Sequence, residues 1–296
     1  RMVLLDHLTK GRVILGCGPG ALASDALMLG IKPERQRAMM EESLDAIIRL
    51  MSDPEPYTVK TDWFEMNDAV LQLRPYQDPI VPVAVASVES PAGVTLAGKH
   101  GASILSLSVP RDTIRKTSLA ELWSIAEETA AEHGKEMHRE DWGVVMGMHL
   151  AETKEQAMKD IRESSANLVT EYFGETLGNP VPDVPRDQIV DYMVDHNQWI
   201  VGTPDDCIAG IERLQEITGG FGKFMIRVED WAPRDKIHRS YELLARYVMP
   251  HFQGSLEGIR ISRDWASDRK EALQQNRYAG IKAATDRFDA GRSNGR

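Results

Sequence analysis

The feature that most constrains this fold is the alternation of short apolar runs with longer amphipathic segments. The apolar runs, each bounded by turn-forming or polar residues, occupy 13–16, 80–86, 103–109, 142–150 and 224–228. Segments whose apolar residues recur at helical spacing follow them, at 34–51, 91–99, 118–133, 152–173 and 234–249. Strands that alternate with helices predict a parallel sheet with helices on its faces.

Five such units fit two architectures, an open doubly wound sheet or the last five units of an eight-stranded barrel of about 250 residues. The start of the chain favours the barrel. Residues 2–8 carry apolar side chains at helical spacing, but Arg1 is not a residue that caps a helix. This start is more typical of a fragment than of a processed chain. We therefore expect the α/β class and an incomplete (β/α)8 TIM barrel in which about strands four to eight are present.

The remaining segments indicate the domain organisation. Residues 174–200 are rich in proline and aspartate, which predicts an irregular excursion, and Thr203 followed by Pro204 is typical of a helix start. The polar segment 255–296 carries apolar residues at helical spacing. It indicates helices that pack on the barrel or on a partner, with a basic nucleic-acid arm as the alternative. We predict a barrel portion over 1–254 and a helical, polar C-terminal extension over 255–296.

Net charge and cysteine content limit which partners and which cellular compartment we expect. The net charge of −10 argues against binding to nucleic acid or to an anionic membrane surface. The two cysteines, Cys17 and Cys207, are too few for a disulfide framework. No apolar run reaches the length of a membrane span. We therefore expect a cytoplasmic protein, with neither nucleic acid nor a membrane among its partners.

A glycine-rich turn with Gly16, Gly18 and Gly20 follows the first apolar run. A dinucleotide-binding fold would need G-x-G-x-x-G opening directly into a helix. Here the third glycine comes one residue early, and the next clear helix is expected only near Pro33. Two interpretations stay open. The turn either closes a strand end tightly, or its small residues leave room for a flat cofactor at the carboxyl mouth of a barrel.

Three other positions are candidates for a site. Ser90 and the backbone N–H groups of the helix that starts at Pro91 would form an anion site, unless Ser90 only caps that helix. His149, near a strand end, would donate a proton or bind substrate, unless it is a core histidine with satisfied hydrogen bonds. Cys17 lies beside the glycine turn without an obvious base. Because no group of His, Cys or carboxylates has metal-ligand spacing, we expect no metal site.

Taken in order, several segments resemble the bacterial luciferase-like flavin monooxygenases, and most closely their limonene-monooxygenase-like branch. The segments are 4–12, 16–20 with 29–30, 89–101, V-G-T-P-D-D at 201–206, 219–222, 230–232 and 240–250. The resemblance implies a (β/α)8 barrel that binds reduced flavin mononucleotide (FMN) and uses O2 to oxygenate a small, apolar organic substrate. It also implies an NAD(P)H-dependent flavin reductase that supplies the reduced flavin, and a homo-oligomer for the full-length protein.

The resemblance assigns cofactor-binding residues by position. Glu89 and Ser90 match family residues near the FMN phosphate, and Gly93 would donate a backbone N–H there. Gly18 and Gly20 match the strand-four wall of the same site. Candidate cofactor contacts therefore lie on two neighbouring strand ends.

The sequence departs from the family pattern in two places. Pro19 stands where luciferase has an arginine on the phosphate, so the neutralising charge would come from elsewhere. The family's first three strands, with the catalytic histidine of luciferase, have no counterpart here. Two related functions stay open, namely hydride transfer with the deazaflavin F420 on the same barrel and a non-catalytic flavin-binding partner subunit. An unrelated barrel lyase or hydrolase is a further alternative, but we find no acid–base pair for it.

Overall fold

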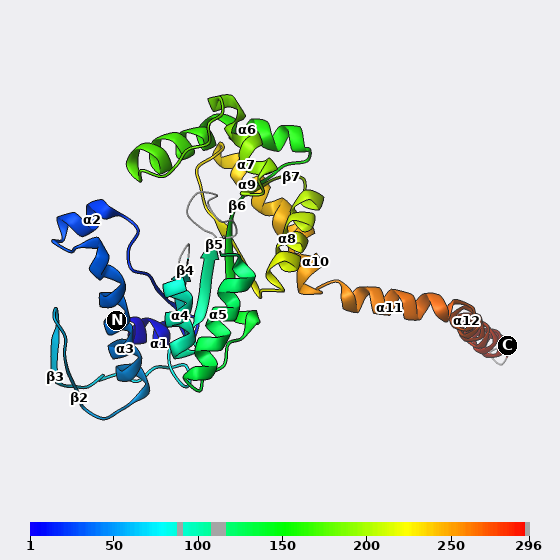
Figure 1. Ribbon diagram of the computed structural model, residues 1–296. Coiled ribbons are helices and arrows are strands. Elements are labelled where there is room, and N and C mark those ends of the chain that lie inside the picture. Colours follow the sequence, from blue (N-terminus) through cyan, green and yellow to red (C-terminus); the bar gives the residue numbers. More distant parts are fainter. Residues whose placement is uncertain (88–90, 108–116, 294–296) are drawn as a thin grey trace. The chain divides into compact units, whose positions relative to one another are not determined.

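The computed structural model describes residues 1–87, 91–107 and 117–293 (Figure 1). It divides into two compact units, Arg1–Tyr241 and Glu242–Arg296. The predicted boundary between residues 254 and 255 falls within the second unit, and a separate extension over 255–296 stays a prediction.

A parallel sheet forms the centre of the first unit (Figure 1). Its described strands are β1 (Leu15–Cys17), β4 (Val83–Ser87), β5 (Ser103–Leu107), β6 (Gly143–Leu150), β7 (Trp199–Gly202) and β8 (Lys223–Arg227). They lie in the order β1-β4-β5-β6-β7, and β8 also pairs with β6. Every pairing between them is parallel. The structure therefore confirms the α/β class and the predicted parallel sheet.

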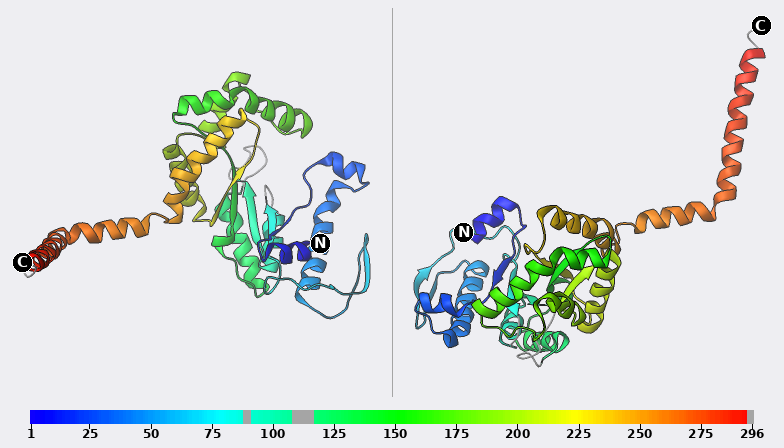
Figure 2. Two further views of the ribbon diagram at one scale, coloured as in Figure 1. Left: turned by 180° about the vertical axis from the view of Figure 1, so that it is seen from behind. Right: turned by 90° about the horizontal axis from the view of Figure 1, so that it is seen from above.

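Helices connect the strands of this unit and cover the sheet. They are α1 (Met2–Thr9), α2 (Ala23–Met28), α3 (Gln36–Ser52), α4 (Pro91–His100), α5 (Leu119–Glu132), α6 (Lys154–Asn167), α7 (Ile189–Asp195), α8 (Pro204–Thr218) and α9 (Arg234–Leu243). Figures 1 and 2 show α4 and α5 side by side next to β4 and β5. The two helices approach closely because Gly98 has no side chain, since a Cβ there would lie 2.5 Å from the carbonyl oxygen of Ala126.

Capping residues explain where two of these helices begin. The Ser118 hydroxyl accepts the Glu121 N–H at 3.1 Å, and the Glu121 carboxylate accepts the Ser118 N–H at 2.6 Å. Thr203 and Asp206 form the same reciprocal pair at the start of α8. Each pair satisfies N–H groups that have no partner within the helix. The predicted helix start at Thr203 is confirmed.

Three elements differ from the sequence expectation. Helix α2 follows the glycine turn before Pro33, and it is too short for helical periodicity to reveal it. The excursion 174–200 contains α7 and the first residues of β7, a buried four-residue strand without polar alternation. The segment expected to be helical over 234–249 continues past Pro250, because this residue lies in the first turn of α10 (Met249–Gln253), where a missing N–H costs no hydrogen bond.

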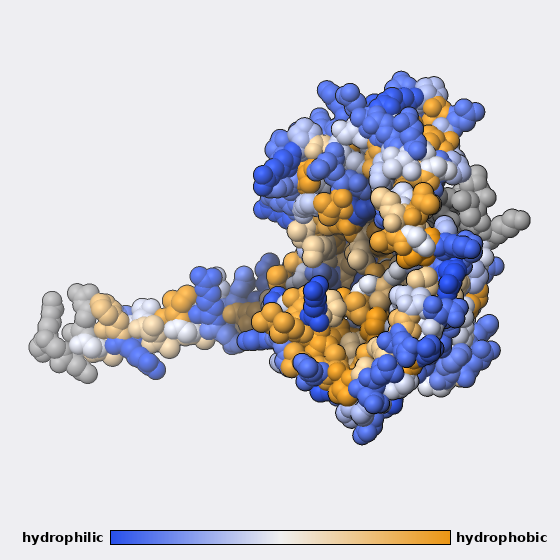
Figure 3. All heavy atoms as spheres, turned by 90° about the vertical axis from the view of Figure 1, so that its left-hand side faces the viewer, coloured by the Kyte–Doolittle hydropathy of each residue, from blue (hydrophilic) through white to orange (hydrophobic). Residues whose placement is uncertain are grey.

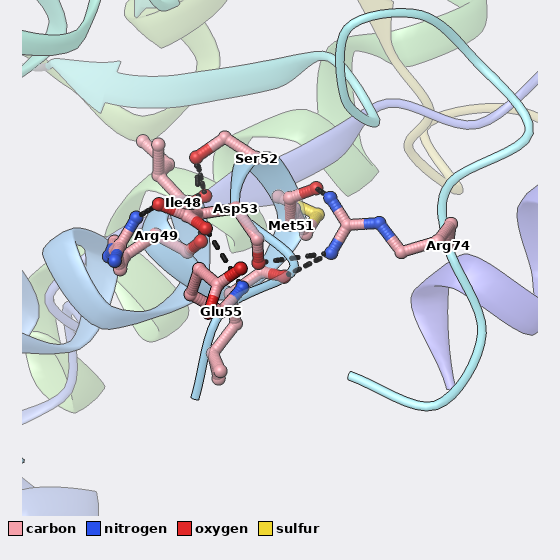
Figure 4. A network of polar contacts seen from close by, with 8 residues as sticks. Ile48, Arg49, Met51, Ser52, Asp53, Glu55 and Arg74 are labelled. Atoms are coloured by element: carbon pink, nitrogen blue, oxygen red, sulfur yellow. Dashed lines mark hydrogen bonds and ion pairs between the residues drawn. The ribbon is translucent and has the colours of Figure 1, made fainter. Parts of the chain in front are cut away.

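Arg74 fixes the segment that follows α3 (Figure 4). This segment contains a hairpin, formed by β2 (Tyr57–Lys60) and β3 (Glu65–Ala69). The Arg74 guanidinium donates to the carbonyl oxygens of Leu50 and Asp53, both at 3.1 Å, and also to that of Met51. Carbonyls at a helix end lack partners within the helix and attract a cation. The Arg74 side chain therefore caps the carboxyl end of α3 and fixes the segment that leads to β4.

A pair of tryptophans packs beside the amino end of β6. Trp123 of α5 and Trp142 stack with ring centroids 4.9 Å apart, and Trp142 Nε1 donates to Ser106 Oγ at 3.1 Å. The Arg139 guanidinium lies over both rings, 4.8 Å from the Trp123 centroid and 5.8 Å from that of Trp142. The same guanidinium donates to the carbonyl oxygens that end α8. Arg139 therefore joins α5, β6 and α8.

The sheet does not close into a ring within the described residues, since β1 and β8 do not pair with each other. Hydrophobic side chains near β1 are exposed, with Leu4 at 54%, Leu8 at 73% and Ile14 at 51%. Figure 3 looks onto the side of α2 and α3, where hydrophobic residues gather over much of the face. An open edge with exposed apolar side chains agrees with the expected incomplete barrel.

The second unit is helical. It contains a short π-helix (Leu244–Val248), α10, α11 (Glu257–Asp268) and α12 (Lys270–Ser293). Every residue from 251 to 291 is exposed. Helices α11 and α12 are therefore not held by a buried core of their own.

Candidate functional site

A cleft of about 270 Å³ lies where β5 and β8 end, beside the middle of β6 and the start of β7. Apolar side chains that line it are Leu107, Val145, Val169, Phe173, Met193 and Trp199, and polar ones are Asn179, Asp183, Gln198 and Arg227. Strands β5, β6, β7 and β8 contribute one wall. Carboxyl ends of parallel strands are where barrels and open α/β sheets bind ligands. The cleft is therefore the candidate site for a small apolar molecule.

The opposite wall comes from the extension of α6. This helix continues as a π-helix over Leu168–Thr176, which brings Val169 and Phe173 to the cleft. A π-helix is a strained arrangement that occurs frequently at functional sites. The chain then turns through 179–183, which also lines the cleft. The segment predicted as an irregular excursion is thus one wall of the candidate site.

Arg227, the last residue of β8, supplies positive charge to the cleft. Its guanidinium forms an ion pair with Glu229 and lies 5.3 Å from the centre of the Phe173 ring. A cation over an aromatic face is attracted by the ring quadrupole. Arg227 therefore links the sheet wall to the π-helix wall and presents a hydrogen-bond donor beside apolar surface.

Gly147 of β6 allows two tryptophans to pack against the strand. The rings of Trp199 and Trp231 lie with centroids 4.4 Å apart, and both side chains are buried. A Cβ at Gly147 would lie 2.6 Å from Trp231 Cη2 and 2.9 Å from Trp199 Cδ1. Glycine within a strand often marks such a close approach. The shape of the cleft at Trp199 thus depends on this glycine.

The structure brings two of the predicted cofactor-binding residues together around Ala86, near the end of β4. A Cβ at Gly18 would lie 3.4 Å from the Ala86 Cβ, and a Cβ at Gly93 would lie 2.8 Å from the Ala86 carbonyl oxygen. Ser87 is buried, and its hydroxyl has no hydrogen-bond partner among the described residues. Small residues, an unpaired hydroxyl and the start of α4 are a donor set that fits a phosphate. The predicted residues Glu89 and Ser90 lie outside the described residues.

Gly20 lies apart from this group. It has a φ of +88°, and a Cβ there would lie 3.1 Å from Gln36 Nε2, which itself donates to the Pro19 carbonyl oxygen. Gly18, Gly20 and Cys17 line a second, apolar groove between the glycine turn and α3. Burial raises the pKa of the Cys17 thiol, which lowers the fraction of reactive thiolate.

His149 is buried in β6 on the side of α6, and it is not among the described residues that line the cleft. Its Nε2 lies 3.6 Å from Asp160 Oδ2, longer than a hydrogen bond. Burial is the largest influence on the pKa of His149 and lowers it, Asp160 raises it and Lys236 lowers it, with a net decrease. A catalytic role for His149 stays a prediction. Its surroundings favour a neutral imidazole.

We expect the free energy of unfolding to fall as the pH is lowered through and below 6.5, the ordinary pKa of histidine. The unfolded chain binds a proton there that folded His149 resists, so acid favours unfolding. His100, whose pKa burial also lowers, acts in the same direction. Urea midpoints at pH 7.5 and pH 5.5 measure the effect. His149→Gln should reduce the difference between the two midpoints, and an unchanged difference would contradict this assignment.

Sequence reasoning did not single out Arg227, Phe173, Trp199 or Gly147. For two of these residues the sequence contains a pattern that could have identified them. Gly147 interrupts an apolar strand, which is typical of close approach, and Arg227 is a cation at the end of the last strand. The sequence contains no such signal for Phe173 or Trp199, because the conformation of the segments around them depends on tertiary packing.

Within residues 1–87, 91–107 and 117–293, no group of three or more His, Cys, Asp or Glu is placed to hold a metal ion. None of the helices in those ranges is both long and apolar enough to cross a membrane.

Comparison with known families and curated proteins finds monooxygenases among the matches. The family model described as luciferase-like monooxygenase matches residues 1–219. The 4-hydroxyprotoasukamycin monooxygenase of Streptomyces nodosus subsp. asukaensis is 44% identical over 276 residues, which covers 92% of this chain and 74% of that protein. The limonene 1,2-monooxygenase of Rhodococcus erythropolis is 42% identical over 302 residues, which covers 99% of this chain and 74% of that protein.

Solved structures share the fold at lower identity. The oxygenating constituent of 3,6-diketocamphane monooxygenase from Pseudomonas putida, in complex with FMN, superposes with a TM-score of 0.66 at 20% identity, covering 84% of this chain and 74% of that one. An F420-dependent secondary alcohol dehydrogenase superposes with a TM-score of 0.60 at 20% identity, covering 83% and 72%.

Proposed function

The chain belongs to the luciferase-like monooxygenase family, and from that premise we propose that it is an FMN-dependent monooxygenase that acts on a small, largely apolar organic molecule. The observation that carries the proposal is the apolar cleft where β5 and β8 end, with Arg227 as its cation among the described lining residues. A fold neighbour described in complex with FMN supports the choice of cofactor.

The end of β4 and the start of α4 would hold the cofactor phosphate. Backbone N–H groups at a helix start lack partners within the helix and attract an anion, and the Ser87 hydroxyl, which has no partner among the described residues, adds a donor nearby. Glu89, Ser90 and Gly93 are the proposed phosphate contacts. When bound, reduced FMN supplies the electrons that activate O2.

The cleft would orient the substrate and exclude water from it. Its aliphatic and aromatic walls favour an apolar body, whereas Arg227 would direct a carbonyl or hydroxyl oxygen towards β8. Phe173, which contacts the Arg227 guanidinium, would cover the substrate from the π-helix side. Exclusion of water strengthens each polar contact within the cleft and limits side reactions.

The decisive experiment mixes the chain with FMN and an NAD(P)H-dependent flavin reductase, the partner that we propose as the source of reduced flavin. Oxygen consumption and product formation are then followed with a panel of small apolar alkenes and cyclic ketones. We expect substrate-dependent formation of an oxygenated product. Oxidation of a substrate with F420 and no use of O2 would instead support hydride transfer. Absence of binding to either reduced cofactor would support a non-catalytic partner subunit.

Ser90→Ala tests the phosphate site separately from catalysis. We expect roughly tenfold weaker binding of FMN, because a hydrogen bond to a charged phosphate is lost. Binding of riboflavin, which has no phosphate, should change little. Fluorescence titration with both flavins gives the ratio, and Ser124→Ala, at an exposed position on α5, is the control. An equal loss for both flavins would refute a phosphate contact at Ser90.

A further inference from the structure

Helix α11 presents a hydrophobic side that no other described residue covers. Ile259, Ile261 and Trp265 are exposed by 68%, 62% and 50%. At 100° per residue, these side chains share about half of the helix circumference with Gly258, Ser262 and Ala266. The other half carries the charged residues Glu257, Arg260, Arg263, Asp264 and Asp268. A helix with two such different sides is typical of one that packs against a partner.

The middle of the hydrophobic side is a row of small residues. Gly258, Ser262 and Ala266 follow one another at intervals of four, so they lie one above the other on the helix. A Cβ at Gly258 would meet no atom within 4 Å. Small residues in a row leave a groove into which the backbone of another helix can approach, with Ile259 on one side and Trp265 on the other.

The charges along the two edges of the hydrophobic side of α11 indicate which partner this helix binds. Glu257 and Asp268 lie along the edge next to Ile261, whereas Arg263 lies along the edge next to Ile259, where its exposed guanidinium also pairs with Asp264 of the same helix. When two parallel helices meet about a twofold axis along their length, each edge faces the opposite edge of the other copy. An antiparallel pair would bring like edges together. The acidic edge of one α11 therefore complements the basic edge of another only in the parallel arrangement.

We propose that α11 is a self-association helix that pairs in parallel with α11 of a second copy of this chain. The rows of small residues meet at the axis, and Arg263 of each copy faces the acidic edge of the other. A 12-residue helix is only about 18 Å long. The paired surface is therefore smaller than the roughly 800 Å² per partner of a stable interface, and association through α11 alone is weak.

An anionic membrane is a poorer occupant of the same surface. Helices that lie on membranes carry Lys and Arg on their polar side. The polar side of α11 instead has two arginines against three carboxylates. The charge pattern thus favours pairing with another copy over binding to lipid.

Cysteine crosslinking of the full chain tests the arrangement. In a parallel pair every residue near the axis lies next to its own counterpart, so both Gly258→Cys and Ser262→Cys should form disulfide-linked dimers under mild oxidation. Ser262 is near the middle of α11 and would also crosslink in an antiparallel pair, whereas Gly258 would not. Ser267→Cys, on the polar side, and the unsubstituted chain with Cys17 and Cys207 are the controls. Crosslinking only at Ser262, or at neither position, would overturn the proposal.

Sedimentation equilibrium tests the groove and the edges without oxidation. Gly258→Leu favours the helix itself but fills the groove, so we expect self-association at least about tenfold weaker. Gly280→Leu, at an open position of α12, should leave association unchanged. Arg263→Glu should weaken association, and adding Asp268→Arg should restore it. Association that is insensitive to Gly258→Leu, or an α11 that binds anionic vesicles as a monomer, would refute pairing of this helix.

Discussion

Gly147→Ala is expected to lower the free energy of unfolding by about 2–4 kcal/mol, because it overpacks a rigid, buried site. The added Cβ would lie 2.6 Å from Trp231 Cη2 and 2.9 Å from Trp199 Cδ1. These rings are buried and packed together, so neither can rotate away without opening the core between β6 and α6. The same displacement would move Trp199, which lines the candidate cleft.

Gly143→Ala, on the same strand, is the matched control. Its Cβ would lie 2.8 Å from Leu105 Cδ2 and 3.0 Å from Met225 Sδ. Both atoms are ends of flexible side chains that can shift, so we expect a loss of only about 1 kcal/mol. Urea denaturation of the two variants and of the unsubstituted chain measures the difference. Equal losses would show that the tryptophan pair does not determine the cost at Gly147.

Arg139→Ala is expected to cost about 2–4 kcal/mol through two lost interactions. The guanidinium donates to the carbonyl oxygens of Thr218 at 2.8 Å and Gly220 at 3.1 Å, and it covers the stacked rings of Trp123 and Trp142. Without it, the end of α8 loses two hydrogen bonds and the tryptophan pair loses its cation. Thermal and urea denaturation give the size of the effect.

Arg139→Lys tests whether the positive charge of Arg139 or the planar shape of its guanidinium accounts for the stabilisation. Lysine keeps the positive charge but not the planar fork that bonds two carbonyls while stacking on a ring. We therefore expect Arg139→Lys to recover less than half of the stability lost in Arg139→Ala. Full recovery by lysine would show that charge alone explains the contribution of Arg139.

Two of the predicted cofactor-binding residues lie close together in the structure. Gly18 and Gly93 were assigned through a family resemblance, and the structure places both next to Ala86. Their phosphate role stays a prediction, as does that of Glu89 and Ser90. The substrate side was not predictable, because Phe173 and Arg227 come from a π-helix and a distant strand. No local pattern relates two such segments.

The sequence by itself determined that strands alternate with helices along most of the first unit, and where α8 starts. Apolar periodicity and capping pairs are local, since each depends on residues within one or two turns of each other. Tertiary structure alone decided that residues 174–200 contain α7, that Trp199 and Trp231 meet over Gly147, and that Arg227 contacts Phe173. These contacts join segments far apart in the chain. They form because close packing leaves one arrangement of the side chains, which no stretch of sequence encodes alone.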